Sequence, residues 1–221
     1  MILSGTIPRG DREKSAFARL VAFLAALLLT SGCRQTPSTG GSPIAEWMPA
    51  SENKDFIADG WQTFDDPTHA FLVRYPPEWN RADVTEPFRF LAYKESADCG
   101  VQLHPMIELG TQSSVNLSVK RENIDELARQ AFAGRAIADV TRGELGNRAF
   151  VRATAETQIA QSSKPLWRKE YLLAVFTPGR LWRLHCGVSL ASQQEAAASF
   201  TALQLSFEQF FKSFAVYRSG P

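Results

Sequence analysis

The sequence is poor in the residue types on which most catalytic and metal sites are built. Its 221 residues include three cysteines, three histidines and three methionines. It has no G-x-S-x-G segment, which would favour a serine hydrolase, and no glycine-rich phosphate loop. Members of a Ser–His–Asp triad need not be close in the chain, so the sequence leaves a triad open. We interpret the three histidines as packing or solvent-facing residues, and predict no enzyme, no catalytic residue, no metal and no cofactor.

The sequence also lacks an excess of charge of either sign. It carries 24 basic and 23 acidic residues, of which residues 1–32 hold four and two, which leaves 20 and 21 in the rest. A nucleic-acid-binding surface would show as a basic excess or patch. The charge balance therefore argues against a nucleic-acid partner.

Long hydrophobic runs are absent as well. One apolar block, residues 20–29, follows four basic residues and precedes Thr30-Ser31-Gly32; the basic residues are Arg9, Arg12, Lys14 and Arg19. As a helix, ten residues cover about 15 Å, half of a bilayer core of about 30 Å. The layout predicts an export signal over residues 1–32 and not a permanent membrane span.

Cys33 directly follows the small residues of this signal. The arrangement resembles the bacterial lipobox, in which the thiol is acylated before the chain is cut on its N-terminal side; Thr30 stands where that motif most often has leucine. On this resemblance we predict Cys33 as the lipidation site. Several acyl chains attached to one residue would hold the protein stably at a membrane. The alternatives are an ordinary secretory signal with an incidental Cys33, and a cytoplasmic protein with an apolar first helix. Arg34, in place of Asp, favours the outer membrane by analogy with lipoprotein sorting.

Residues 33–55 are predicted to be the lipidated cysteine and a flexible tether. Within them, residues 34–51 are rich in Pro, Gly and Ser and have no sustained period. A chain of this kind has a typical reach of about 20–25 Å. The remaining residues, 56–217, are predicted to form one domain.

Two periodicities alternate in this domain. Period-two patterns predict strands at 71–75, 88–93, 101–103, 115–119, 150–157, 169–176 and 181–188. Helices are predicted to start after Asn123 and Ser192, each followed three residues later by a glutamate. The last helix carries an aromatic stripe, which we interpret as core and not as a ligand box: Phe200, Leu203, Phe207, Phe210, Phe211 and Phe214. The fold class expected is α+β, an antiparallel sheet flanked by helices.

Cys99 and Cys186 fall on core-facing positions of two predicted strands. Outside the cytoplasm such a pair normally oxidises, and we predict a disulfide between them. One alternative is a zinc site from Cys99, His104, His185 and Cys186, whose geometry is poor because His185 and Cys186 point to opposite faces of a strand. Two buried free thiols are the other. His69 and His104 are expected in loops or at strand edges.

Four basic residues surround the last hairpin and form a candidate patch for an anionic partner: Arg168, Lys169, Arg180 and Arg183. Arg183 and His185 share the outward face of the strand. A solvated sheet face explains the same residues.

The ordered set of these segments resembles the PsbP-like domains, a superfamily that includes a photosystem II subunit and many bacterial lipoproteins. The similar segments are V-R-Y-P-P-E-W at 73–79, S-V-N-L-S-V at 114–119 as a third strand, 124–133 as a first helix, G-R-L-W at 179–182 and K-S-F at 212–214. The similarity covers residues 60–216. It implies an α/β/α sandwich and no reaction, since these domains mostly bind, scaffold or assist assembly.

These observations predict a lipid-anchored, non-catalytic envelope protein that binds or helps to assemble another protein. It would lie on the periplasmic face of the outer membrane, or at the thylakoid membrane in a cyanobacterium. A photosynthetic accessory protein that supports photosystem II is the first alternative. A hydrolase or metal-dependent enzyme is the second, and it requires a pocket that holds a histidine within about 3.2 Å of a hydroxyl or carboxylate.

Overall fold

A computed structural model of the chain describes residues 60–106, 110–160 and 164–217. The predicted signal, Cys33 and the predicted tether lie outside these residues, as do the first four residues of the predicted domain. Among the described residues, no helix combines the length and the apolar character that a membrane crossing requires.

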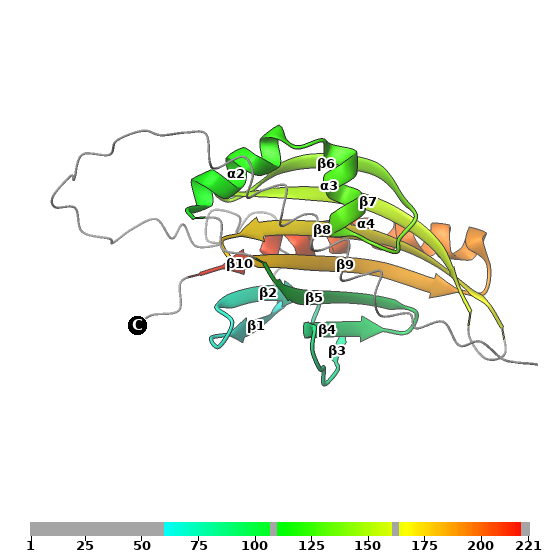
Figure 1. Cartoon of the computed structure of the whole chain (residues 1–221). Coiled ribbons are helices and arrows are strands. Elements are labelled where there is room, and N and C mark those ends of the chain that lie inside the picture. Colours follow the sequence, from blue (N-terminus) through cyan, green and yellow to red (C-terminus); the bar gives the residue numbers. More distant parts are fainter. Residues whose placement is uncertain (1–59, 107–109, 161–163, 218–221) are drawn as a thin grey trace, which may run out of the picture.

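A seven-stranded antiparallel sheet forms the centre of the domain (Figure 1). Its order is β3-β4-β5-β9-β8-β7-β6, with β3 at Asn80–Arg81, β4 at Phe88–Lys94, β5 at Ala97–Pro105, β6 at Ile137–Leu145, β7 at Arg148–Ile159, β8 at Leu166–Thr177 and β9 at Arg180–Leu190. Most neighbours are successive strands. The pairing of β5 with β9 joins segments that are far apart in sequence, and it connects the two halves of the sheet.

A second, three-stranded sheet packs against the first. It consists of β1 (Gln62–Asp66), β2 (Phe71–Tyr75) and β10 (Ala215–Val216), in the order β1-β2-β10. The Phe71 ring lies 5.2 Å from the ring of Trp182 in β9 and 6.0 Å from that of Phe214. These aromatic contacts bind the small sheet to the large one.

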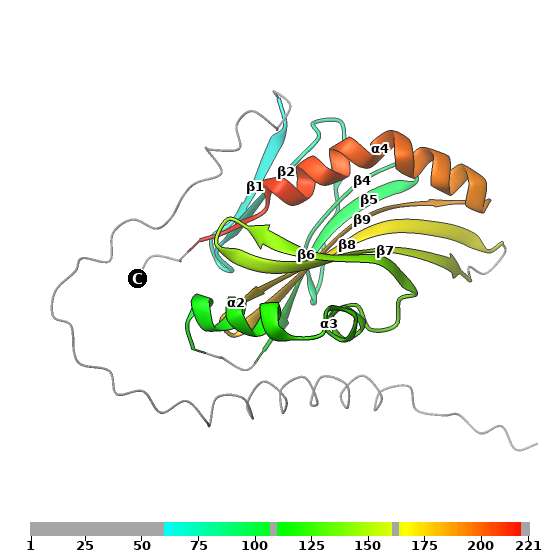
Figure 2. The ribbon, with the colours of Figure 1, turned by 90° about the horizontal axis from the view of Figure 1, so that it is seen from above.

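The helices of the described residues lie on the two faces of the large sheet (Figure 2). Helix α4 (Gln193–Ser213) covers one face together with the small sheet, and α2 (Gln112–Arg121) and α3 (Ile124–Ala131) cover part of the other. The prediction of an α+β fold with an antiparallel sheet flanked by helices is confirmed.

The predicted starts of α3 and α4 are also confirmed. The Asn123 side chain accepts hydrogen bonds from the backbone N–H of Asp125 and Glu126, and the Ser192 hydroxyl accepts one from Glu195 N–H. Each cap satisfies donors that have no partner inside the helix, which fixes where the helix begins.

The large sheet separates two apolar cores. The first, under α4, contains the predicted aromatic stripe and the fully buried Trp182. The second lies under α2 and α3 and is built from smaller side chains of β7 and β8. The aromatic stripe therefore packs α4 against the sheet, as predicted.

The strand predicted at 115–119, and its interpretation as a third strand in the PsbP-like resemblance, are wrong. These residues belong to α2, which Thr111 caps by accepting a hydrogen bond from Ser114 N–H. Val115 and Val119, four residues apart, are buried, whereas Leu117 is 47% exposed. Alternating apolar residues fit a strand, but the same residues at i and i+4 fit one face of a helix, and packing against β7 and β8 decides between the two.

Candidate functional site

Half of the large sheet is left without a helix on one side. Helices α2 and α3 lie over β6, β7 and β8, and no described helix covers β4, β5 and β9 from this side (Figure 1). The side chains that point outward there, called the open face from here on, are Phe88, Leu91, Tyr93, Asp98, Gln102, His104, Arg183 and His185. Most are half-buried, and Tyr93 is 43% exposed.

A buried ionic cluster forms one end of the open face. The Arg168 guanidinium donates two hydrogen bonds of 2.7 Å to the Asp98 carboxylate and one of 2.8 Å to Glu170 Oε2. It donates a fourth, of 3.1 Å, to the Ser189 hydroxyl. Arg168 is 8% exposed and Glu170 only 1%. Buried charges are tolerated where each is paired and hydrogen-bonded, and this cluster meets that condition.

Two side chains extend the cluster. His185 Nε2 lies 3.2 Å from Asp98 Oδ1, and Arg135 Nη1, in the turn after α3, lies 3.3 Å from Glu170 Oε1. The second contact has the geometry of an ion pair and not of a hydrogen bond. The turn after α3 is thereby tied to the end of the open face.

Glycines on β5 and β9 make room for this cluster. Asp98, Gly187 and Glu170 stand side by side on β5, β9 and β8, so Arg168 reaches Asp98 across Gly187. A Cβ at Gly187 would lie 2.9 Å from the Arg168 guanidinium. A Cβ at Gly100 would lie 2.5 Å from the His185 ring. The Arg168 and His185 side chains can lie flat on the sheet because Gly187 and Gly100 have no side chain in the way.

The cluster fixes the charge of its members. Burial alone would raise the pKa of Asp98, but the hydrogen bonds from Arg168 and His185 outweigh it and hold that pKa well below its usual range. Burial would lower the pKa of Arg168, and the bonds and charges of Asp98 and Glu170 raise it instead. Asp98 is therefore a permanent carboxylate and Arg168 a permanent cation at neutral pH.

The centre of the open face is a polar group on β5 and β9. Gln102 and Arg183 are directly opposite each other, and His104 Nε2 lies 3.2 Å from Gln102 Oε1. Burial, with the positive charge of Arg183, lowers the pKa of His104 to about 4. His104 is therefore neutral at neutral pH. Two aromatic rings lie beside this group. The Phe88 ring contacts the His185 ring edge-on, and their centroids are 5.8 Å apart.

The structure does not bring the four basic residues of the predicted patch together. Arg168 is buried in the ionic cluster, whereas Lys169 points to the opposite face, where its Nζ lies 2.8 Å from Glu156 Oε1. Arg180 is at the far end of the hairpin and donates to the backbone oxygen of His69. Successive residues of a strand point to opposite faces, and nine residues of β8 separate Arg168 from the turn. Arg183 is the member of the set that the open face contains.

The predicted disulfide between Cys99 and Cys186 is present, with an S–S distance of 2.01 Å. The two residues are directly opposite each other on β5 and β9 and face the core under α4. Both sulfurs are in the disulfide, so this structure contains neither the alternative zinc site nor the alternative pair of free thiols. The described residues contain no group of three or more histidine, cysteine, aspartate or glutamate side chains that could hold a metal ion.

His69, in the turn between β1 and β2, forms a separate pair with Asp66. Its Nδ1 lies 2.8 Å from Asp66 Oδ2, and its backbone N–H donates to Asp66 Oδ1. The same carboxylate therefore closes the turn and orients the ring. The prediction of a loop setting for His69 holds, and His104 lies near the end of β5 as expected.

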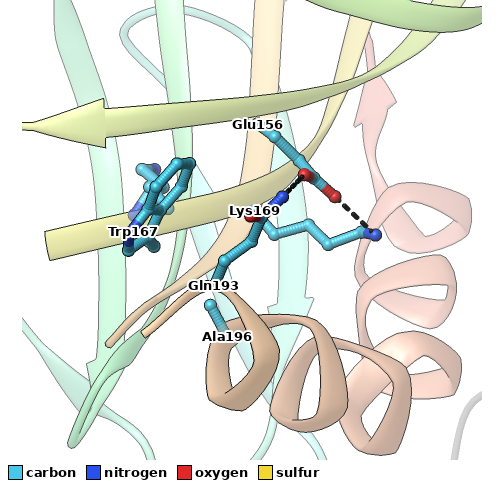
Figure 3. Close-up of a pocket in the computed structure, with 6 residues that line it drawn as sticks. Glu156, Trp167, Lys169, Gln193 and Ala196 are labelled. Atoms are coloured by element: carbon cyan, nitrogen blue, oxygen red, sulfur yellow. Dashed lines mark hydrogen bonds and ion pairs between the residues drawn. The ribbon is translucent and has the colours of Figure 1, made fainter. Parts of the chain in front are cut away.

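A small depression lies on the opposite side of the sheet, where α4 begins (Figure 3). Its empty volume, open solvent included, is about 150 Å³. Lys169 and Gln193 both contact the Glu156 carboxylate there, at 2.8 and 2.9 Å. Ligand pockets typically measure about 300–1,000 Å³, and the charges here satisfy each other. The depression is therefore not a candidate site.

Two histidines, His69 and His185, meet the distance to a carboxylate that the enzyme alternative requires. Asp98 is held by two hydrogen bonds from Arg168, which reduces its ability to polarise His185. Asp66 lies in a tight turn with His69. A general base also needs a nucleophile or substrate proton within reach. The open face presents fixed charges, hydrogen-bond donors and aromatic rings.

Comparison with known proteins gives limited similarity. No family model matches the chain, and no curated protein matches its sequence. A solved structure from Bacteroides thetaiotaomicron VPI-5482 matches 72% of this chain at 13% identity and a TM-score of 0.44, and this chain spans 50% of its length.

Two further solved structures are similar. The Ran-binding protein Mog1p of Saccharomyces cerevisiae is 10% identical over 71% of this chain and 95% of its own, with a TM-score of 0.43. LpqN, involved in cell envelope biogenesis of Mycobacterium tuberculosis, is 9% identical over 72% of this chain and 87% of its own, with a TM-score of 0.37. Values this low establish neither a family nor a function for this chain, and the PsbP-like relationship stays a prediction.

Sequence reasoning missed most of the ionic cluster. It identified Arg168 as a surface cation and gave no role to Asp98, Glu170 or Ser189. One signal was present: Arg168 and Glu170 are two charged residues on one face of β8, and the other residues of that face are apolar. Two such residues indicate burial with a partner, but the partner comes from β5, and only the β5–β9 pairing brings it there.

Proposed function

We propose that this protein is a lipid-anchored, non-catalytic protein of the bacterial cell envelope that binds another protein through the open face. The observation that carries the proposal is the half of the large sheet that no described helix covers, where aromatic, arginine and histidine side chains gather on β4, β5 and β9. Tyrosine and arginine are enriched among the residues that dominate binding energy in protein interfaces. Tyr93 and Arg183 provide both types on one surface.

The rigidity of this surface supports the same function. The ionic cluster and the Cys99–Cys186 disulfide join β5, β8 and β9 directly beneath and beside the open face. A surface that is already ordered loses little conformational freedom when a partner binds. The open face is thus suited to recognition by preformed shape and charge.

The binding face is tested by site-specific photo-crosslinking in the native host. A photoreactive phenylalanine analogue replaces Tyr93 on the open face, and in a control strain it replaces Leu117 on α2, which is exposed to a similar extent, 47% against 43%. We expect a discrete adduct with one protein from position 93 and none from position 117. Equal adducts from both positions, or none from position 93, would refute the binding face.

The anchor is tested separately, because Cys33 lies outside the described residues. In Cys33→Ser no thiol remains for acylation, and we expect the protein to move from the detergent phase to the aqueous phase on phase separation. Metabolic labelling with a fatty-acid analogue should fail in the same variant. Retention in the detergent phase would show that the chain is held by something other than a lipid on Cys33.

A further inference from the structure

We propose that His185 is a specificity-determining residue of the open face, and that its Nδ1 accepts a hydrogen bond from a tyrosine or tryptophan side chain of the partner. This inference rests on the proposed function, because it names the chemistry by which the partner is recognised on the same surface. It concerns the end of the open face where the ionic cluster lies, and it is independent of the lipid anchor.

The ionic cluster fixes which nitrogen of His185 carries the proton. Nε2 lies 3.2 Å from Asp98 Oδ1. Asp98 also accepts two hydrogen bonds from Arg168 and stays ionised, and an ionised carboxylate can only accept. A lone pair on Nε2 would be repelled by this negative oxygen, so Nε2 carries the proton. In the neutral ring, Nδ1 then has the lone pair and is a hydrogen-bond acceptor.

The Nδ1 atom of His185 is available to a partner. It makes no hydrogen bond or ion pair within the part of the chain that the structure describes. The buried polar side-chain atoms that lack a partner do not include it, so it retains contact with solvent. The side chain as a whole is only 14% exposed, and its ring lies over Gly100. The open face therefore presents a fixed acceptor at one accessible atom.

Apolar side chains flank the His185 ring on the side of β4. Leu91 is directly opposite Gly100, over which the ring lies. The Phe88 ring contacts the His185 ring edge-on. Tyr93, two residues beyond Leu91, adds an exposed aromatic ring on the same face. A group that reaches Nδ1 from β4 is therefore in contact with apolar surface.

These surroundings favour a donor that is carried by an aromatic ring. Tyrosine and tryptophan combine a large apolar body with one O–H or N–H donor, and both are enriched in protein interfaces. A charged donor is less suited, because the two carboxylates of the cluster, Asp98 and Glu170, are already paired with Arg168 and Arg135. A sugar presents several hydroxyl groups that each need a polar partner, whereas the β4 side is apolar.

The first test needs no variant, because the chain has only three histidines. The full chain, purified in detergent with ¹⁵N-labelled histidine, is studied by long-range ¹H–¹⁵N NMR spectroscopy at about pH 8, well above the ordinary pKa of histidine. We expect His185 to be the Nε2–H tautomer, and its Nδ1 signal to shift on titration with N-acetyltyrosinamide. N-acetylphenylalaninamide, which lacks the hydroxyl, should leave that signal in place.

Three results of this titration would overturn the proposal. The first is a His185 ring that carries its proton on Nδ1 or carries two protons. The second is an equal response to the two amides, including no response to either. The third is a larger shift with N-acetylglucosamine, which would assign the atom to a glycan.

The second test uses the crosslink from position 93 in the native host. His185→Phe keeps an aromatic ring and removes the acceptor, whereas His185→Gln keeps a donor for Asp98 and an acceptor oxygen. We expect the yield of the adduct to fall about threefold to tenfold in His185→Phe, as for the loss of one hydrogen bond, and to be restored in His185→Gln. The control is His69→Phe, which removes another histidine paired with a carboxylate, away from the open face, and should leave the yield unchanged.

The outcomes separate this proposal from the proposed function. If position 93 crosslinks to one protein but His185→Phe leaves the yield unchanged, or His69→Phe lowers it equally, the binding face stands and the role of His185 does not. A folded His185→Gln that fails to restore the yield also overturns that role. If His185→Phe does not fold, the titration of the natural protein decides. If position 93 gives no specific adduct, the proposed function itself fails.

Discussion

Arg168 connects three strands through one guanidinium. It stands on β8, binds Asp98 on β5 and Ser189 on β9, and neutralises Glu170 on its own strand. A buried ion pair is weak support for stability as a whole, because desolvation offsets much of the attraction. Removing one member of the pair destabilises the protein strongly, because the remaining charge is buried where water cannot replace the lost partner.

Replacement of Arg168 by methionine should therefore be severe. The change keeps a long side chain but leaves Asp98 and the 1% exposed Glu170 without their cation, and we expect a loss of about 3–5 kcal/mol in the free energy of unfolding. Urea denaturation of the purified protein measures this loss.

The matched control is the adjacent Lys169→Met. It removes the same charge from the opposite face, where the pair with Glu156 is partly exposed, and should cost less than about 1 kcal/mol. Similar losses in the two variants would contradict the importance of the buried cluster.

At the scale of elements, the β4–β5 hairpin contains a residue in an unfavourable conformation. Its loop consists of Glu95 and Ser96, between the paired residues Lys94 and Ala97. Glu95 has a φ of 53°, in the left-handed region that favours glycine. Two-residue hairpin loops commonly have glycine at such a position. The backbone conformation of Glu95 is therefore less favourable than that of the residues in the two strands that the loop joins.

Glu95→Gly should stabilise the protein by up to about 1 kcal/mol, because the cost of a Cβ in the left-handed region disappears. The gain is partly offset by the greater freedom of glycine in the unfolded chain. Ser96→Gly, next to it and without a positive φ, has only the offsetting effect and should destabilise slightly. Chemical denaturation of the two variants distinguishes these directions, and a gain in both or in neither would contradict the backbone argument.

At the scale of the whole molecule, the Cys99–Cys186 disulfide links the first half of the sheet to the last. The two residues are 87 positions apart, and the chain between them contains α2, α3, β6, β7 and β8. In the chain-entropy model, a bond that closes a loop of this length contributes about 4–5 kcal/mol by restricting the unfolded chain. The β5–β9 pairing, on which the open face depends, is therefore covalently fixed.

The double variant Cys99→Ala and Cys186→Ala should lose stability of that order. Reductant should bring the natural protein down toward the variant and leave the variant itself unchanged. Denaturant midpoints with and without reductant make the comparison. A natural protein whose midpoint does not respond to reduction after full unfolding would show that the bond contributes little.

The sequence by itself determined those features that depend on neighbours in the chain. Helix starts at Asn123 and Ser192, the aromatic stripe of α4 and most strands follow from local spacing and capping, which act over a few residues. The disulfide also followed, because strand parity placed both thiols on core-facing positions. Each of these features was inferred from spacing or capping within a short segment.

Only the tertiary structure decided the rest. Val115 and Val119 fit a strand or a helix equally until β7 and β8 supply the surface against which they pack. The ionic cluster and the open face exist because β5 pairs with β9, which brings Asp98, Gly187 and Glu170 into one row from two distant parts of the chain. Contacts between distant segments depend on the cost of closing the chain and on packing over the whole sheet, and no local pattern encodes either quantity.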